Sequence, residues 1–325
     1  MRQLARMRRG AMTAALLAAA VTGSLLTGCT AGGGATDDGR GRTQGPTEGN
    51  DGTTKSGSVL AVKIDNVRAA RPQTGLDAAD VVYAEQVEGG LSRLMAVYAS
   101  RFPKVVGPVR SARESDLELL RQFDEPTLAF SGAQHKLLPL IDRAPLHAQP
   151  PESVSGAYYR GTDKPAPHNL YLRPQRLMGS APGSAALTAG FHFGQAPTGG
   201  SPETSRTVRF PAARFTFTWS GSRQRWLVNM DGTPTVTTDG KTVAPATVVV
   251  QYVKVRASQF HDVLGNNTPY TETVGSGKAK VLRDGRVFDA NWARPSATDG
   301  TEFTTTGGAP MNFAQGQVWV VFAKA

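Results

Sequence analysis

Two arginines stand close together in residues 107–113 (Gly-Pro-Val-Arg-Ser-Ala-Arg), directly before a segment with helical spacing of apolar residues. Ser111 and Glu114 have the spacing of a capping box, which predicts a helix that starts at Ser111. The start of a helix attracts anions, and guanidinium groups bind phosphate or carboxylate in a bidentate manner. We therefore expect Arg110 and Arg113 to bind an anion. Ser111 is interpreted as a helix cap rather than a nucleophile, since no Gly-x-Ser-x-Gly elbow surrounds it.

Other polar residues are candidates for the same site. Arg71 and Arg93 flank predicted turns, where an arginine either faces a pocket or fixes a loop through backbone carbonyls. The amides of neighbouring motifs complete the set. The residues expected to bind the ligand are Asn66, Arg71, Gln73, Arg93, Arg110, Arg113, His168 and Asn169.

Three residues are candidates for proton transfer. His168 follows Pro167 in a stiff, extended stretch, which would hold the imidazole in one orientation, and imidazole is a side-chain group that suits acid–base chemistry. The alternative is a histidine bonded to the main chain. Glu85 and Glu88 are either a general acid and base or the counter-ions that clustered arginines require when buried, and we favour counter-ions.

The remaining histidines do not have the spacing of metal ligands. His135, His147, His192 and His261 are irregularly placed, and the chain has a single cysteine. We expect no metal site and no cofactor.

The N-terminus predicts export and a lipid anchor. Residues 1–9 carry four arginines, residues 11–26 are almost wholly apolar or small, and Leu-Thr-Gly-Cys follows at residues 26–29. This apolar stretch is short for a membrane span of about 30 Å and is typical of a signal peptide. Leu-Thr-Gly-Cys is a lipobox, so we expect residues 1–28 to be removed and Cys29 to carry acyl chains such as palmitate. The chain would then be held at the extracytoplasmic face of the cell membrane.

The charge of the mature chain is moderately basic. Loss of the four signal-peptide arginines leaves 32 basic and 26 acidic residues, a net charge of +6. This favours anionic neighbours, which in a cell envelope are wall polymers and lipid head groups. No aromatic residues alternate with Lys and Arg as a platform for bases would require, so we expect no nucleic-acid partner. The oligomeric state is left open.

The rest of the chain divides into a tether and two predicted domains. Residues 29–57 are mostly Gly, Thr, Asp and Ser, which favours a flexible tether. Residues 58–195 combine strands at 59–64, 79–85, 91–100 and 127–130 with helices at 111–123 and 135–141, which predicts a mixed α/β domain. Residues 196–325 repeat strand, tight turn and strand, with four turn signals such as Asp284-Gly285, and predict a small all-β domain. The fold class expected overall is α+β.

Several of these segments resemble, in order and spacing, the YerB-like bacterial lipoproteins, a family defined by an N-terminal and a C-terminal domain of unknown function. The resemblance rests on residues 65–66, 70–76, 85–93, 107–113 and 166–171, and in the second domain on residues 248–251, 275–277, Trp292 and 316–319. It covers nearly all of the mature chain. The resemblance implies this architecture and address but no reaction. Asp65 departs from the family, whose members tend to have a second amide before the Asn.

Three functions are compatible with these features. We favour a non-catalytic lipoprotein that binds an anionic cell-envelope ligand. The first alternative is a cell-wall hydrolase or phosphotransferase that uses His168 with Glu85 or Glu88. The second alternative is a scaffold for another secreted protein.

Overall fold

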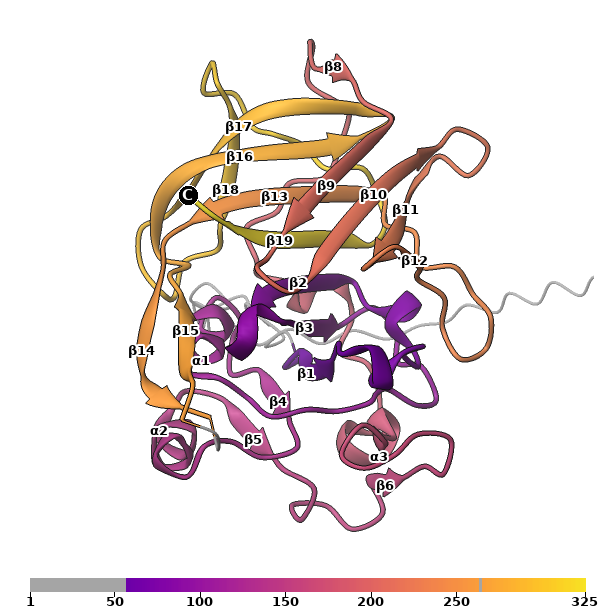
Figure 1. Cartoon of the computed structure of the whole chain (residues 1–325). Coiled ribbons are helices and arrows are strands. Elements are labelled where there is room, and N and C mark those ends of the chain that lie inside the picture. The colour runs from indigo at the N-terminus through magenta and orange to yellow at the C-terminus, as the bar shows by residue number, and fades with distance from the viewer. Residues whose placement is uncertain (1–56, 263–264) are drawn as a thin grey trace, which may run out of the picture. The chain divides into compact units, whose positions relative to one another are not determined.

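A single large sheet contains strands from both halves of the chain in the computed structural model, which describes residues 57–262 and 265–325. Its order is β18-β17-β16-β13-β19-β2-β3-β1-β4-β5, with β8 paired to β17 (Figure 1). The strands of the first half are β1 (Leu60–Asp65), β2 (Val81–Gln86), β3 (Ser92–Tyr98), β4 (Thr127–Ala129) and β5 (His147–Gln149). Those of the second half are β8 (Ser201–Pro202), β13 (Thr247–Val253), β16 (Gly275–Arg283), β17 (Arg286–Arg294), β18 (Glu302–Thr305) and β19 (Val318–Lys324).

The last strand joins the two halves. β19 pairs in parallel with β13 on one side and with β2 on the other. The predicted boundary near residue 195 therefore separates two segments that share one hydrogen-bonded sheet.

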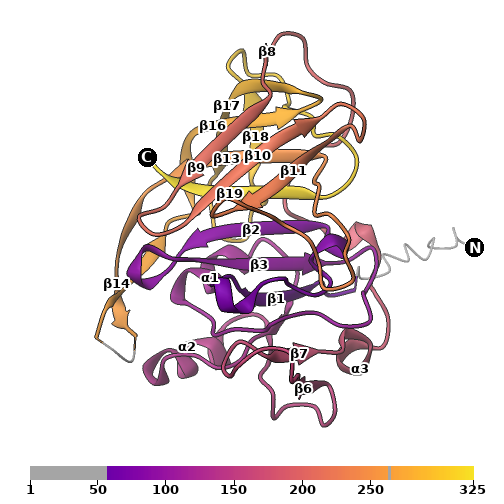
Figure 2. The same cartoon turned by 45° about the vertical axis from the view of Figure 1, so that its right-hand side comes forward.

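A second sheet packs on one face of the large sheet. It has the order β12-β11-β10-β9, and its strands are β9 (Ser205–Arg209), β10 (Arg214–Ser220), β11 (Arg225–Met230) and β12 (Thr233–Pro234). β9 and β10 lie across β13 and β19 in both views (Figure 2). Phe215 and Phe217 meet the ring of Trp319 edge to face, which is a favoured aromatic geometry. One buried apolar core fills the space between these sheets, and another covers the opposite face of the large sheet.

The helices of the described residues are few and short. They are α1 (Glu114–Leu120), α2 (Leu138–Arg143) and α3 (Pro174–Met178), with single 3-10 turns at Arg68–Ala70, Leu76–Ala78, Glu88–Gly90, His135–Leu137 and Ser184–Ala186. All regular elements of the described chain after residue 195 are strands, so the described residues as a whole are mostly β. The predicted Asp284-Gly285 turn connects β16 and β17, and both residues have the positive φ of a type I′ hairpin.

The helix predicted at Ser111 begins later, at Glu114. Residues 108–112 are held extended by backbone hydrogen bonds. The backbone N–H of Arg110 donates to the carbonyl of Lys63, and the backbone N–H of Ala112 donates to the carbonyl of Gly132. The Asp116 carboxylate then accepts the backbone N–H of Arg113 at 2.7 Å. Ser111 is therefore not the cap, and that prediction is wrong.

Two smaller pairs of strands complete the fold. β6 (Tyr158–Arg160) pairs with β7 (Leu170–Leu172), and β14 (Val255–His261) pairs with β15 (Asn267–Thr271). The β14–β15 pair, which we call the arm, extends beside α1 (Figure 1). The arm brings the second half of the chain against the first.

The predicted signal peptide, Cys29 and the tether up to residue 56 lie outside the described residues. Within the part of the chain that is described, no helix has the length and apolar character needed to cross a membrane.

Candidate functional site: a pocket with three arginines

A row of charged residues crosses three neighbouring strands of the large sheet. Arg93 on β3 is in register with Asp65 on β1 and with Glu85 on β2. Residues in register on adjacent strands project from the same face of a sheet. Arg93 therefore stands between two carboxylates, but neither carboxylate is its ion-pair partner. Asp65 pairs with Arg110, and Glu85 pairs with Lys63.

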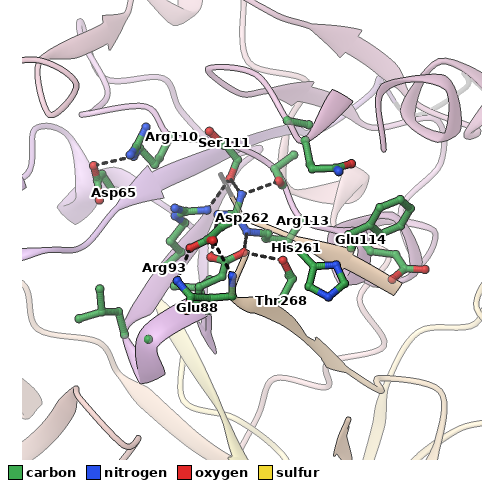
Figure 3. A pocket seen from close by; sticks show the side chains of 18 of the residues that line it. Asp65, Glu88, Arg93, Arg110, Ser111, Arg113, Glu114, His261, Asp262 and Thr268 are labelled. Atoms are coloured by element: carbon green, nitrogen blue, oxygen red, sulfur yellow. Dashed lines mark hydrogen bonds and ion pairs between the residues drawn. The ribbon is translucent and has the colours of Figure 1, made fainter. Parts of the chain in front are cut away.

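A pocket of about 570 Å³ opens at this end of the sheet, and we call it the arginine pocket (Figure 3). Its polar wall includes Asp65, Glu88, Arg93, Arg110, Arg113 and His168. The arm supplies another wall with Phe260, His261, Asp262, Asn266 and Thr268. Residues from both halves of the chain thus line one pocket of a size that suits a small ligand.

Asp65 orients the side chains of Arg110 and His168. The buried carboxylate binds Nδ1 of His168 at 2.8 Å and Nε of Arg110 at 3.2 Å through the same oxygen, Oδ2. A carboxylate on Nδ1 fixes the imidazole and directs Nε2 away from the contact. Asp65 is therefore the residue that positions the His168 side chain.

Glu88 and Arg113 form the tightest ion pair of the pocket. Nε and Nη2 of Arg113 lie 2.6 and 2.7 Å from the two carboxylate oxygens, and the hydroxyl of Thr268 donates to Glu88 at 2.6 Å. Burial by itself would raise the pKa of Glu88, but the bonds from Arg113 and Thr268 outweigh it and hold the pKa below its ordinary value. Glu88 therefore serves as a counter-ion, and its charge is fully engaged.

Arg93 is the arginine of this pocket that has no carboxylate partner among the described residues. Its Nη1 donates to the carbonyl oxygen of Ser111 at 3.2 Å, and it forms no ion pair with any described residue. Burial, followed by repulsion from Arg113, lowers the pKa of Arg93 to about 9. A guanidinium in this position would be stabilised by an anion in the pocket.

A fully buried charged cluster lies behind the pocket. The ammonium group of Lys63 on β1 binds Glu85, and it binds Asp116 on α1 at 2.6 Å. Ser115 donates to the other oxygen of Glu85 at 3.1 Å. Burial lowers the pKa of Lys63 to about 8, against the opposing effect of Asp116. Glu85 lies outside the pocket lining and neutralises Lys63 rather than an arginine.

Four of the predicted ligand-binding residues do not line the arginine pocket. The amide oxygen of Asn66 accepts hydrogen bonds from Arg71 and Gln73, and Arg71 also pairs with Asp231 at 2.9 Å. The amide of Asn169 bonds to Arg160 and to the carbonyl of Gly161. These side chains are tied to other parts of the protein, whereas Arg93, Arg110, Arg113 and His168 share the pocket.

Sequence reasoning missed the arm and the buried lysine. The arm residues lie far along the chain, and no local pattern links them to Glu88. Lys63 did carry a signal, since it interrupts the apolar run of residues 59–64. Within residues 57–262 and 265–325, no group of three or more His, Cys, Asp or Glu side chains is placed to hold a metal ion.

Comparison with protein families identifies both halves of the chain. The N-terminal domain of a protein family of unknown function, DUF3048, matches residues 46–187, and its C-terminal domain matches residues 206–320. The chain belongs to the DUF3048 family. This agrees with the resemblance seen in the sequence motifs.

One relative of this DUF3048 chain is a protein of Bacillus subtilis (strain 168) named "Putative lipoprotein YerB". It is 24% identical over 275 residues, which is 80% of each chain. The crystal structure of the YerB protein from Bacillus subtilis matches with a TM-score of 0.68 at 20% identity, over 82% of this chain and 91% of that one. The structural match establishes a shared fold.

Proposed function

We propose that this DUF3048 chain is a lipid-anchored, non-catalytic protein of the bacterial cell envelope, which binds an anionic ligand in the arginine pocket. The location is supported by the signal peptide and lipobox that the sequence predicts and by the name of the relative, "Putative lipoprotein YerB". Lipid on Cys29 would confine the binding domain to the space next to the membrane.

The observation that carries the binding proposal is Arg93. It is the arginine of the pocket that has no carboxylate partner among the described residues, while Arg110 and Arg113 are paired. A bound phosphate or carboxylate group would supply the negative charge that Arg93 lacks as a partner. It would also accept hydrogen bonds from the remaining N–H groups of Arg93. Arg110 and His168 lie on the same wall and would contribute further donors.

The distribution of acids makes the position of the anion specific. Glu114 also lines the pocket, on the side away from Asp65 (Figure 3), and accepts a hydrogen bond from Ser258. Asp262 lines the pocket as well, and an anion near Glu114 or Asp262 would be repelled. The carboxylates of Glu88 and Asp65 are already paired with Arg113 and Arg110. The position that we propose for the anion is therefore beside Arg93, Arg110 and His168.

The test is a titration of the full chain, held in a neutral detergent, with inorganic phosphate at constant ionic strength. We expect saturable binding that is weakened at least about tenfold by Arg93→Met, since charge-assisted hydrogen bonds are lost. Arg143→Met is the matched control, because Arg143 is exposed and lines none of the pockets described. Equal affinity of the Arg93→Met and Arg143→Met variants would contradict the proposal.

A hydrolase is a second candidate, and the Asp65–His168 contact favours it. Water would give a proton to Nε2 of His168 while its oxygen attacks a phosphoryl or acyl centre held by the arginines, and the proton would pass to the leaving oxygen as the bond breaks. Glu85 and Glu88 are occupied by Lys63 and Arg113 and take no part in this step.

This second candidate predicts release of p-nitrophenolate from bis(p-nitrophenyl) phosphate. The release should be lost in His168→Gln and strongly reduced in Asp65→Asn, because the dyad orients the base. The unaltered chain could instead bind phosphate and release no p-nitrophenolate. This result would exclude the hydrolysis of phosphodiesters and leave the binding function intact.

A further inference from the structure

We infer that the ligand is an extended chain of repeated anionic groups, which runs from the arginine pocket across two adjoining pockets. This inference rests on the proposed function and adds the class of ligand. It is carried by the way in which one segment, residues 65–73, lines three pockets in succession.

The second pocket adjoins the arginine pocket directly. It measures about 490 Å³, and it shares the lining residues Val67, Leu91 and Ser92 with the arginine pocket. Its own lining includes Arg68, Arg209 and Arg214. A ligand that leaves the arginine pocket past Leu91 therefore enters a second space that is also lined by arginines.

A third pocket continues the series. It measures about 310 Å³ and shares Arg68 with the second pocket. Arg71, Pro72 and Gln73 follow along its wall. The segment that starts at the last residue of β1 thus contributes Asp65 to the first pocket, Asn66 to the second and Gln73 to the third, in the order of the sequence.

The cations of the second pocket are available to a ligand. Arg68, Arg209 and Arg214 form no ion pair with the described residues, and the nearby Asp231 is paired with Arg71. Arg68 and Arg209 are exposed. Arg93 in the first pocket and these three in the second therefore present guanidinium groups without carboxylate partners in two adjoining pockets.

This arrangement suits a chain better than separate small anions. When two sites are adjacent, a second anionic group on the same chain binds as an intramolecular event, so the affinity of the chain exceeds that of one unit. Leu91, exposed although apolar, stands where the two pockets meet and would contact the neutral link between charged units. Phosphate and carboxylate chains share the required chemistry.

The experiment compares single anions with short chains, using the full protein in neutral detergent at one ionic strength. The probes are inorganic phosphate, linear polyphosphate of about ten units, and galacturonate as the monomer and as an oligomer of about ten units. Neutral dextran oligomer is the blank. The variants are Arg68→Ala with Arg209→Ala, and the exposed pair Arg143→Ala with Arg223→Ala as a control of equal charge.

We expect a chain to bind at least about tenfold more tightly than its monomer. The double variant of Arg68 and Arg209 should lose that gain and keep the affinity for the monomer, while the control pair should keep both. The gain should identify the source: gain with polyphosphate alone indicates a phosphate chain, and gain with oligogalacturonate alone indicates a carboxylate chain.

Two results would overturn the inference and leave the proposed function intact. The first is monomer binding that depends on Arg93 without any gain for either chain. The second is a gain that Arg68→Ala with Arg209→Ala leaves unchanged. By contrast, absence of phosphate and galacturonate binding, or monomer binding that Arg93→Met does not affect, would contradict the proposed function itself.

Discussion

Lys63 and Arg93 are cations on neighbouring strands of one sheet, and their surroundings differ. Lys63 on β1 is fully buried and is held by two carboxylates, Glu85 and Asp116. Arg93 on β3 faces a pocket and bonds to one carbonyl oxygen, that of Ser111. The first cation is satisfied by the protein, whereas the second has donors for something else. Side chains that are satisfied should determine stability, and Arg93 should determine binding.

The largest expected effect is at Lys63. Lys63→Met leaves two carboxylates buried without their cation, and removal of one partner from a buried ion pair costs about 3–5 kcal/mol. Urea unfolding of the full chain measures this loss. The triple variant with Glu85→Gln and Asp116→Asn should recover part of it, because no uncompensated charge remains. Equal stability of Lys63→Met and the unaltered chain would contradict the assignment of Lys63 to stability.

Glu118 provides a smaller effect that depends on pH. Its carboxylate accepts hydrogen bonds from the hydroxyl of Tyr270 at 2.8 Å and from the N–H and hydroxyl of Thr273 at 2.8 and 2.9 Å. Burial alone would raise its pKa, but the bonds from Thr273 and Tyr270 outweigh burial and hold the pKa below the ordinary 4.5. Glu118→Gln should cost about 1–3 kcal/mol at neutral pH, since it disturbs charge-assisted bonds.

The sign of the pH dependence follows from the lowered pKa. The contribution of the Glu118 charge is present above pH 4.5, the ordinary value, and is lost as the pH falls through the lower pKa of the folded state. The difference in unfolding free energy between Glu118→Gln and the unaltered chain should therefore shrink in acid. A difference that stays constant from pH 7 down to pH 3 would contradict this explanation.

Local sequence patterns predict some elements of this fold correctly. The strand at residues 59–64 and the Asp-Gly hairpin of β16 and β17 follow from local patterns, and both were predicted. The cap at Ser111 was wrong because Asp116, three residues after Arg113, competes for the same role, and because residues 108–112 bond to β1 and Gly132. Local spacing could not distinguish these alternatives.

The site itself could be predicted only in part. The pocket does bring together Arg93, Arg110, Arg113 and His168. The partners of two other residues were not predicted: Arg71 pairs with Asp231, and Glu88 accepts a hydrogen bond from Thr268. Both partners lie more than a hundred residues further along the chain. Contacts of this kind depend on how the sheets pack, and one sequence carries no local record of them.

The smallest effect on stability is expected at the arm. Thr268→Ala removes one hydrogen bond to Glu88, while the ion pair with Arg113 remains. The loss should be about 1 kcal/mol, measured by urea unfolding beside Thr306→Ala, an exposed threonine, as control. A loss as large as that of Lys63→Met would mean that the arm, rather than the ion pair, secures Glu88.

We propose that Arg93 is kept for a ligand, and the most direct test measures stability and binding together. Urea unfolding of the full chain is followed with and without phosphate at constant ionic strength, for the unaltered protein and for Arg93→Met. Without phosphate the two should agree within about 1 kcal/mol, because no buried ion pair is broken. Phosphate at a hundredfold excess over its Kd should stabilise the unaltered protein by about 2.7 kcal/mol and Arg93→Met far less. Equal stabilisation of both proteins by phosphate would contradict the proposal that Arg93 binds the anion.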